Sequence, residues 1–248
     1  MRDIHVTGET LPEAYHEALK KLWALGERCD CTDWHTRAIE LSMTMTVLHP
    51  LQEPMISKFF IGGQKELQQY CMEMLDGILD FEVEKGKWAY TYHQRYADQY
   101  DFVVSELRRN PDSRRAVMTI RDKDADMGSD DPACLQHIQY FIRNGKLDCM
   151  VLFRSNDACK ATFMNAFALI MLQKRIADEL SVGVGIYVHR ANSFHCYERD
   201  YKNLNTFARR LAVDPDFEST YNYVGDWKDE MDDCIPEILG EVEELKRR

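Results

Sequence analysis

The chain has 248 residues, 45% of them hydrophobic and 29% charged, and its formal net charge is −11. These proportions are typical of a globular protein with a sizeable core, and the acidic balance argues against an obligatory nucleic-acid partner. The N-terminus has no apolar leader and no apolar run reaches the roughly 18 residues that span a bilayer, so we expect a cytoplasmic protein without a membrane partner.

The eight cysteines show no metal signature. None forms a CxxC pair, and Cys29 and Cys31 are too close for the usual zinc spacing. We therefore expect no metal, and most of the cysteines should be buried free thiols.

The first half of the chain alternates between helical and strand patterns. Residues 11–25 have apolar side chains at helical spacing and predict an amphipathic helix. Residues 39–48 alternate with period two, which predicts a strand. Residues 64–79 and 99–109 return to helical spacing and predict two more helices.

A hairpin dominates the next part. Residues 115–121 predict a strand, and the acidic stretch 122–131 is expected to be an exposed loop. Two alternating apolar runs, 137–143 and 146–154, are then separated by Asn144-Gly145. Asn-Gly in this position is the strongest short-range hairpin signal.

The remaining elements complete an α+β pattern. Residues 163–180 are apolar around most of the helix circumference and predict a buried helix, 182–197 predict a strand, and the charged tail from 229 predicts a helix. No repeat or linker interrupts the chain. The sequence therefore predicts a single domain over residues 1–248, with a mixed or antiparallel β-sheet packed with helices.

Four places carry polar groups that a simple core does not need. They are Arg114-Arg115 at a turn, Arg154-Ser155-Asn156-Asp157 at a strand end, Asn165 in the apolar helix, and the pair His195 and Tyr197. Guanidinium groups suit phosphate, and a carboxamide complements the edge of a pyrimidine. Each place alone is also compatible with a surface ion pair, a buried amide or a strand end. Taken together, they predict a pocket for a phosphate and a base.

These places and Cys134 stand in the order found in the thymidylate synthase family. The matching text is NPDSRRAVMTI, DPACLQHIQYFIRNGKLDCMVLFRSNDACKATFMNAF and ANSFHCYERD. The chain resembles the family well over residues 110–204 and more loosely over 53–96. The resemblance implies a methyltransferase that converts dUMP to dTMP with 5,10-methylene-tetrahydrofolate or a related methylene-pterin.

The resemblance also implies a role for each residue. Cys134 is the nucleophile that attacks C6 of the pyrimidine, since C5 reacts only after that addition. Nearby arginines are expected to lower the pKa of its thiol. For the phosphate, the resemblance implies Arg154 and Ser155, together with Arg114 and Arg115 reaching the phosphate of a neighbouring subunit in a homodimer. It implies Asn165 on the uracil edge and its enolate, and His195 and Tyr197 on the 3′-hydroxyl. It also implies that Gln139 lies near the nucleotide and Asp157 lies between nucleotide and folate.

Two residues are implied in proton transfer. Tyr92 resembles the tyrosine of a water network near C5. Glu66 is favoured as the glutamate that organises the proton-transferring waters, and Glu73, seven residues further on, is the alternative.

Three departures leave other reactions open. The tail EVEELKRR is charged rather than apolar, Ala161 stands where the family has glycine, and folate-side insertions are missing. A dUMP or dCMP hydroxymethylase using the same cysteine chemistry is therefore an alternative, although Asn165 argues against cytosine. A non-catalytic nucleotide-binding or RNA-binding relative is a more remote one.

Overall fold

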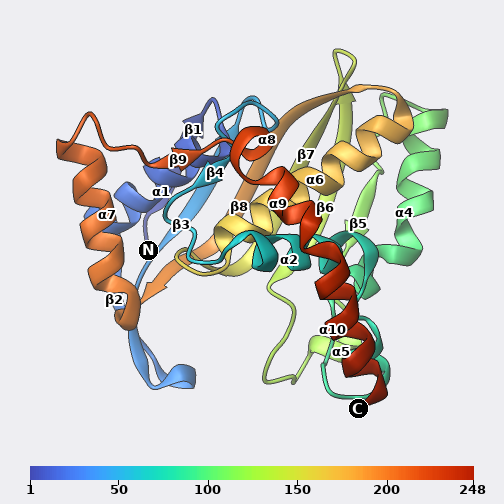
Figure 1. Cartoon of the computed structure of the whole chain (residues 1–248), viewed down its shortest axis with the longest axis horizontal. Helices are drawn as coiled ribbons and strands as arrows, with labels where there is room; N and C mark the ends of the chain where they lie inside the picture. Colours follow the sequence, from blue (N-terminus) through green and yellow to red (C-terminus); the bar gives the residue numbers. More distant parts are fainter.

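A mixed seven-stranded sheet forms the centre of the computed structural model, which describes residues 1–248 (Figure 1). Its order is β1-β3-β8-β7-β6-β5, and β2 pairs with β3 next to β1. The pairs β1–β3 and β7–β8 are parallel and the others antiparallel, while β4 and β9 form a separate small sheet. The strands are β1 (Asp3–Gly8), β2 (Glu27–Cys31), β3 (Thr36–Val47), β4 (Ile56–Ser57), β5 (Val117–Thr119), β6 (Leu135–Arg143), β7 (Lys146–Asp157), β8 (Gly183–Tyr197) and β9 (Thr220–Tyr221).

The helices cover the sheet unevenly. In Figure 1, α6 crosses the near face of the sheet, with α2 and α9 beside it, while α4 stands at the β5 edge. The helices are α1 (Leu11–Leu25), α2 (Gln64–Asp76), α3 (Phe81–Glu84), α4 (Tyr92–Arg109), α5 (Lys123–Asp126), α6 (Thr162–Leu180), α7 (Tyr201–Val213), α8 (Tyr223–Asp226), α9 (Lys228–Asp233) and α10 (Ile235–Arg247). The predicted α+β class with a mixed sheet is confirmed. No helix has both the length and the apolar character needed to cross a bilayer.

The core lies between α6 and the sheet. Along β7, Cys149, Val151 and Phe153 are buried, whereas the alternate residues Met150 and Leu152 are only half-buried. This alternation follows from the period of a strand, which sends successive side chains to opposite faces. These buried residues belong to one continuous apolar cluster.

The predicted hairpin is present as β6 and β7. Its closing pair is Arg143 and Lys146, and the turn residues Asn144 and Gly145 have φ angles of 52° and 72°. Two successive positive φ angles are typical of a type I′ turn, which matches the twist of the flanking strands.

Some elements differ from the predicted ones. The helix expected over 99–109 begins at Tyr92, because the Thr91 hydroxyl caps its first turn by accepting from the Gln94 N–H at 3.0 Å. The helix expected over 64–79 ends at Asp76, before the left-handed Gly77. The elements that were not predicted are β1, β2, α7 and the short β4, α3, β9 and α8.

The prediction of an exposed loop over 122–131 was wrong in part. This stretch contains α5, and Asp126 at its end is only 3% exposed. Its carboxylate accepts from Arg95 at 3.0 Å and from the Asp122 N–H at 3.0 Å. A charge pattern marked the stretch as acidic, but only the fold supplies the cation that makes burial of Asp126 favourable.

We expect Asp126→Ala to lower the free energy of unfolding by about 3 kcal/mol, because it leaves the largely buried Arg95 guanidinium without its buried charge partner and with only the half-exposed Asp122 at 3.6 Å. Chemical denaturation followed by circular dichroism measures the change. Asp124→Ala is the matched control, since the Asp124 side chain is 80% exposed and its loss should change stability by less than about 0.5 kcal/mol. Equal effects of the two substitutions would contradict the prediction.

Candidate active site

A cavity of about 810 Å³ opens where the C-terminal ends of β7 and β8 meet the start of β6. β7 and β8 are parallel and pair Asp157 with His195, so both ends contribute polar side chains to the same region. The predicted residues that line the cavity are Tyr92, Cys134, Arg154, Ser155, Asp157, Asn165, His195 and Tyr197. Segments about 100 residues apart in the sequence are thus brought together.

Cys134 lies just before β6 and is held there by Arg154. The Arg154 backbone N–H donates to the Cys134 carbonyl at 2.8 Å. Its guanidinium donates to the carbonyls of Ala133 at 3.1 Å and Pro132 at 2.6 Å. Arg154 therefore orders the backbone on either side of the thiol while its charge remains at the cavity.

The expectation of a lowered Cys134 pKa is not met. Burial raises the pKa of this thiol above its ordinary value, the Arg154 charge opposes that effect, and Asp131 adds to it. The desolvation of the half-buried sulfur outweighs the attraction of one guanidinium. The thiol form therefore predominates at neutral pH in the free protein.

We expect the alkylation of Cys134 by iodoacetamide to be slow at neutral pH and to rise with pH. The thiolate is the reactive species, and a raised pKa moves its formation above the value of about 8.5 of a free cysteine. Peptide mass spectrometry after timed labelling gives the rate at Cys134 alone. A half-maximal rate below pH 8 would contradict the prediction.

His195 presents an unpaired polar atom. It is 7% exposed, and its Nδ1 lies 3.5 Å from the Ser155 hydroxyl and 3.4 Å from the Ser193 hydroxyl. Its Nε2 is buried without a hydrogen-bond partner. Burial lowers the pKa of His195, so the ring is neutral near pH 7. A buried unpaired nitrogen in a cavity wall suits a ligand hydroxyl.

Asn165 and Asp157 are fixed by their surroundings. Asn165 is 5% exposed; its Oδ1 accepts from Asn156 at 2.9 Å and its Nδ2 donates to the Tyr70 hydroxyl. The Asp157 Oδ1 accepts the backbone N–H groups of Cys159 and Lys160 at 2.9 and 3.1 Å. Both residues therefore have a constrained orientation before any ligand binds.

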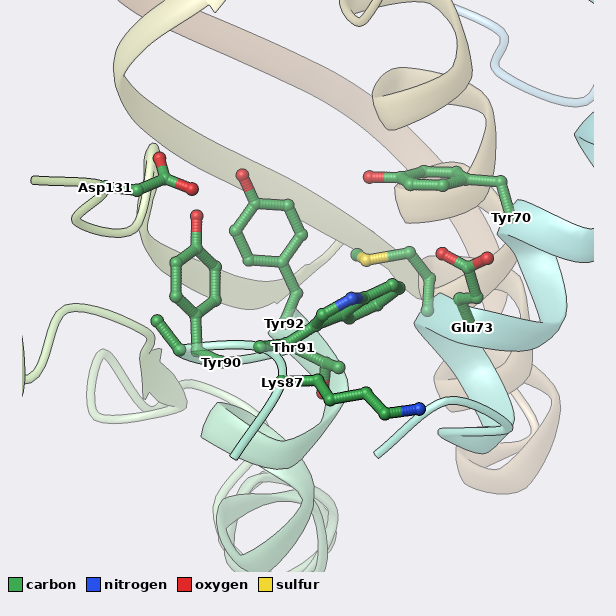
Figure 2. A pocket seen from close by; sticks show the side chains of 10 residues that line it. Tyr70, Glu73, Lys87, Tyr90, Thr91, Tyr92 and Asp131 are labelled. Atoms are coloured by element: carbon green, nitrogen blue, oxygen red, sulfur yellow. The ribbon is translucent and has the colours of Figure 1, made fainter. Parts of the chain in front are cut away.

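A second cavity of about 530 Å³ adjoins the first, and the two share Tyr70, Tyr92 and Asp131. Figure 2 shows Tyr70 and Glu73 on α2, facing Tyr92 and Tyr90 across this space. Burial raises the pKa of Glu73, and a hydrogen bond from Gln69 at 2.9 Å partly offsets this. The second cavity thus combines aromatic walls with a carboxyl group of altered acidity.

Four predicted residues do not line either cavity. Glu66 is exposed and accepts the Gly63 backbone N–H at 2.8 Å at the start of α2. Arg114 and Arg115 are exposed, and the Gln139 side chain donates to the Arg114 carbonyl at 3.0 Å. The geometry therefore favours Glu73, the alternative, over Glu66.

Sequence reasoning missed Tyr70, Trp88 and Asp131. Tyr70 precedes Glu73 by three residues, which places both on one helix face. That spacing was the available signal for Tyr70. Trp88 and Asp131 lie in irregular segments, where no periodicity indicates which way a side chain points.

Comparison with known proteins defines the class. The family model described as thymidylate synthase matches residues 65–228. A protein of Methanocaldococcus jannaschii named "Putative thymidylate synthase" is 34% identical over 214 residues, covering 80% of this chain and 93% of that protein. The chain belongs to the thymidylate synthase family.

Two further similarities bear on fold and reaction. The structure of thermostable thymidylate synthase A from Bacillus subtilis matches with a TM-score of 0.66 at 18% identity, over 81% of this chain and 84% of that one, which shows the fold. The deoxyuridylate hydroxymethyltransferase of Pseudomonas phage M6 is 30% identical over 67% of this chain, and the match spans half of that protein. Family membership makes the chain a one-carbon transferase.

Proposed function

We propose that this protein is a thymidylate synthase that converts dUMP to dTMP by reductive methylation at C5. The observation that supports this is the convergence of Cys134, Arg154, Asn165 and His195 on one cavity. A thiol, a guanidinium, an amide and an imidazole are the groups needed for C6 attack, phosphate, base and sugar, respectively.

In the proposed mechanism, the Cys134 thiol loses its proton to water in the cavity, and the resulting thiolate forms a bond to C6 of the uracil. The electron pair of the C5–C6 double bond moves toward O4, where the unused Nδ2 hydrogen of Asn165 stabilises the enolate. Arg154 and Ser155 bind the phosphate, and the unpaired Nε2 of His195 and the Tyr197 hydroxyl bind the 3′-hydroxyl. Asp157 borders the nucleotide and the one-carbon carrier.

The second cavity fits a pterin co-substrate. Tyr70, Trp88, Tyr90 and Tyr92 offer aromatic faces to a flat ring, and the Glu73 and Asp131 carboxyl groups suit its N–H edges. When bound, 5,10-methylene-tetrahydrofolate or a related methylene-pterin supplies the one-carbon unit and, for methylation, the hydride.

Glu73 is the proposed acid/base residue. It lines the cavity that adjoins the Cys134 cavity, and Tyr70 and Tyr92 belong to both. Burial raises the pKa of Glu73 above its ordinary value, which makes the carboxyl group a more available proton donor than an exposed glutamate. Tyr92 would position the water that carries the proton to or from C5.

A homodimer with shared sites is also proposed. The exposed Arg114 and Arg115 have no role in their own cavity, and Met150, Leu152 and Val188 leave an apolar sheet face half-buried. Two such faces packed together would cover apolar area and bring the arginines to the partner's phosphate site.

We expect a Cys134→Ala variant and an Arg115→Ala variant, each nearly inactive, to regain activity when mixed and refolded together. In a shared-site dimer, one of the two sites in the mixed dimer has both intact residues, so about a quarter of the total activity should return at equal mixing. Steady-state assays of the mixture, with size-exclusion chromatography, test this. Absence of any recovery in a confirmed mixed dimer would contradict the shared site.

A 5-hydroxymethylase is the second candidate, favoured by the similarity to the phage hydroxymethyltransferase. Incubation with dUMP and methylene-tetrahydrofolate separates the two reactions. A methyl product with dihydrofolate supports the synthase, and a hydroxymethyl product with tetrahydrofolate supports the hydroxymethylase. Turnover of dCMP without turnover of dUMP would contradict dUMP as the substrate in both candidate reactions. We also propose a cytoplasmic location.

A further inference from the structure

A buried chain of hydrogen bonds leads from the core to Asn165. The Tyr187 hydroxyl lies 2.9 Å from Nδ1 of His189, and Nε2 of His189 lies 2.9 Å from Oδ1 of Asn156. Nδ2 of Asn156 then donates to Oδ1 of Asn165 at 2.9 Å. These four residues are between 0% and 5% exposed, so water does not compete for their polar atoms.

Tyr187 determines which group donates and which accepts at each step of this hydrogen-bond chain. Its only hydrogen-bond partner is Nδ1 of His189, and a buried phenol hydrogen without an acceptor is costly, so the tyrosine donates. Burial lowers the pKa of His189 to about 3, which makes the ring neutral, with its single hydrogen on Nε2. That hydrogen needs an acceptor, and Oδ1 of Asn156 is the one in reach.

The same donor-to-acceptor order fixes the orientations of the Asn156 and Asn165 amides at the cavity. Because Nε2 of His189 donates to Oδ1 of Asn156, this amide has its oxygen toward His189 and its nitrogen toward Asn165. The Thr162 hydroxyl lies 2.7 Å from the same oxygen and 3.1 Å from the Asp157 carbonyl, which also accepts. The Asn165 oxygen therefore accepts from Asn156, and the Asn165 nitrogen donates to the Tyr70 hydroxyl. One N–H and one lone pair of Asn165 remain for a ligand, in a fixed spatial order.

Uracil and cytosine require opposite orders. Uracil offers a donor at N3 and an acceptor at C4, and cytosine offers an acceptor at N3 and a donor at C4. We infer that His189, acting through Asn156, is a positioning residue that holds the Asn165 amide in the orientation that accepts uracil and rejects cytosine. This inference rests on the proposed binding of a pyrimidine nucleotide in the same cavity.

Asn156→Asp tests the inference by reversing the chain without changing its shape. A carboxylate still accepts from His189 but cannot donate, so Asn165 must turn its Nδ2 toward residue 156 and its oxygen toward Tyr70. We expect the ratio of the dCMP to the dUMP dissociation constant to fall by about 100-fold, because two base contacts reverse at about tenfold each. Calorimetric titration of the intact protein with each nucleotide measures this ratio without turnover.

Asn192→Asp is the matched control. Asn192 lies on β8, the strand that carries His189, but it is exposed, and the substitution adds the same single charge. We expect it to leave the ratio unchanged. If wild type binds dUMP and Asn156→Asp leaves the ratio as Asn192→Asp does, the inference falls while the proposed function stands. If wild type binds neither nucleotide, both fall.

A measurement on the wild-type protein keeps the inference testable should Asn156→Asp fail to fold. Nitrogen-15 NMR distinguishes the two neutral histidine tautomers by the shifts of the ring nitrogens. We expect the His189 hydrogen on Nε2, and a hydrogen on Nδ1 would overturn the direction of the chain. As a second variant, His189→Phe should reduce the discrimination between dUMP and dCMP, and His189→Gln, which keeps a donor near Nε2, should restore part of it.

Discussion

Replacing Cys134 by alanine is expected to lower kcat with dUMP by about four orders of magnitude or more while the protein still binds dUMP. In the proposed mechanism the Cys134 sulfur supplies the covalent bond to C6, and no other thiol lines the cavity. The proposed nucleotide contacts Arg154, Ser155, Asn165 and His195 remain in the variant. Steady-state assays give kcat, and calorimetry gives the dUMP affinity.

The matched control is Cys234→Ala, a half-buried cysteine between α9 and α10 that lines neither cavity. It should leave kcat unchanged. Unchanged turnover in Cys134→Ala would refute the nucleophile assignment, and binding without any turnover in the wild-type protein would favour the non-catalytic relative instead.

Replacing Glu73 by glutamine is expected to lower kcat by about 100-fold or more, with little change in dUMP affinity. Glutamine keeps the size and the hydrogen bond to Gln69 but exchanges no proton, and general acid–base catalysis by one positioned group contributes on the order of 10² to 10⁴. The pH profile of kcat should lose an ionisation that lies above the ordinary range of a glutamate, because burial raises the Glu73 pKa.

Glu66→Gln on the same helix is the paired control for Glu73. Glutamine at the third position of a helix still accepts the Gly63 N–H, so both stability and kcat should be nearly unchanged. A larger loss of kcat in Glu66→Gln than in Glu73→Gln would reverse the assignment of the acid/base residue.

The sequence alone could not decide whether Glu66 or Glu73 is the acid/base residue. Seven residues are close to two full turns, so Glu66 and Glu73 share a helix face, and periodicity cannot separate them. They differ by about 10 Å along the helix axis at 1.5 Å per residue. Only the packing of α2 against α6 and α4 determines which end of that face borders the aromatic cavity.

The sequence by itself determined the family, the hairpin at Asn144-Gly145, the buried helix α6 and eight of the residues that line the cavity, because each depends on local periodicity or on a contiguous motif. The tertiary structure alone decided the burial of Asp126, the raised pKa of Cys134 and the hydrogen-bond chain from Tyr187 to Asn165. Each of these depends on desolvation or on partners from distant segments, and the spacing of residues along the chain predicts neither of them.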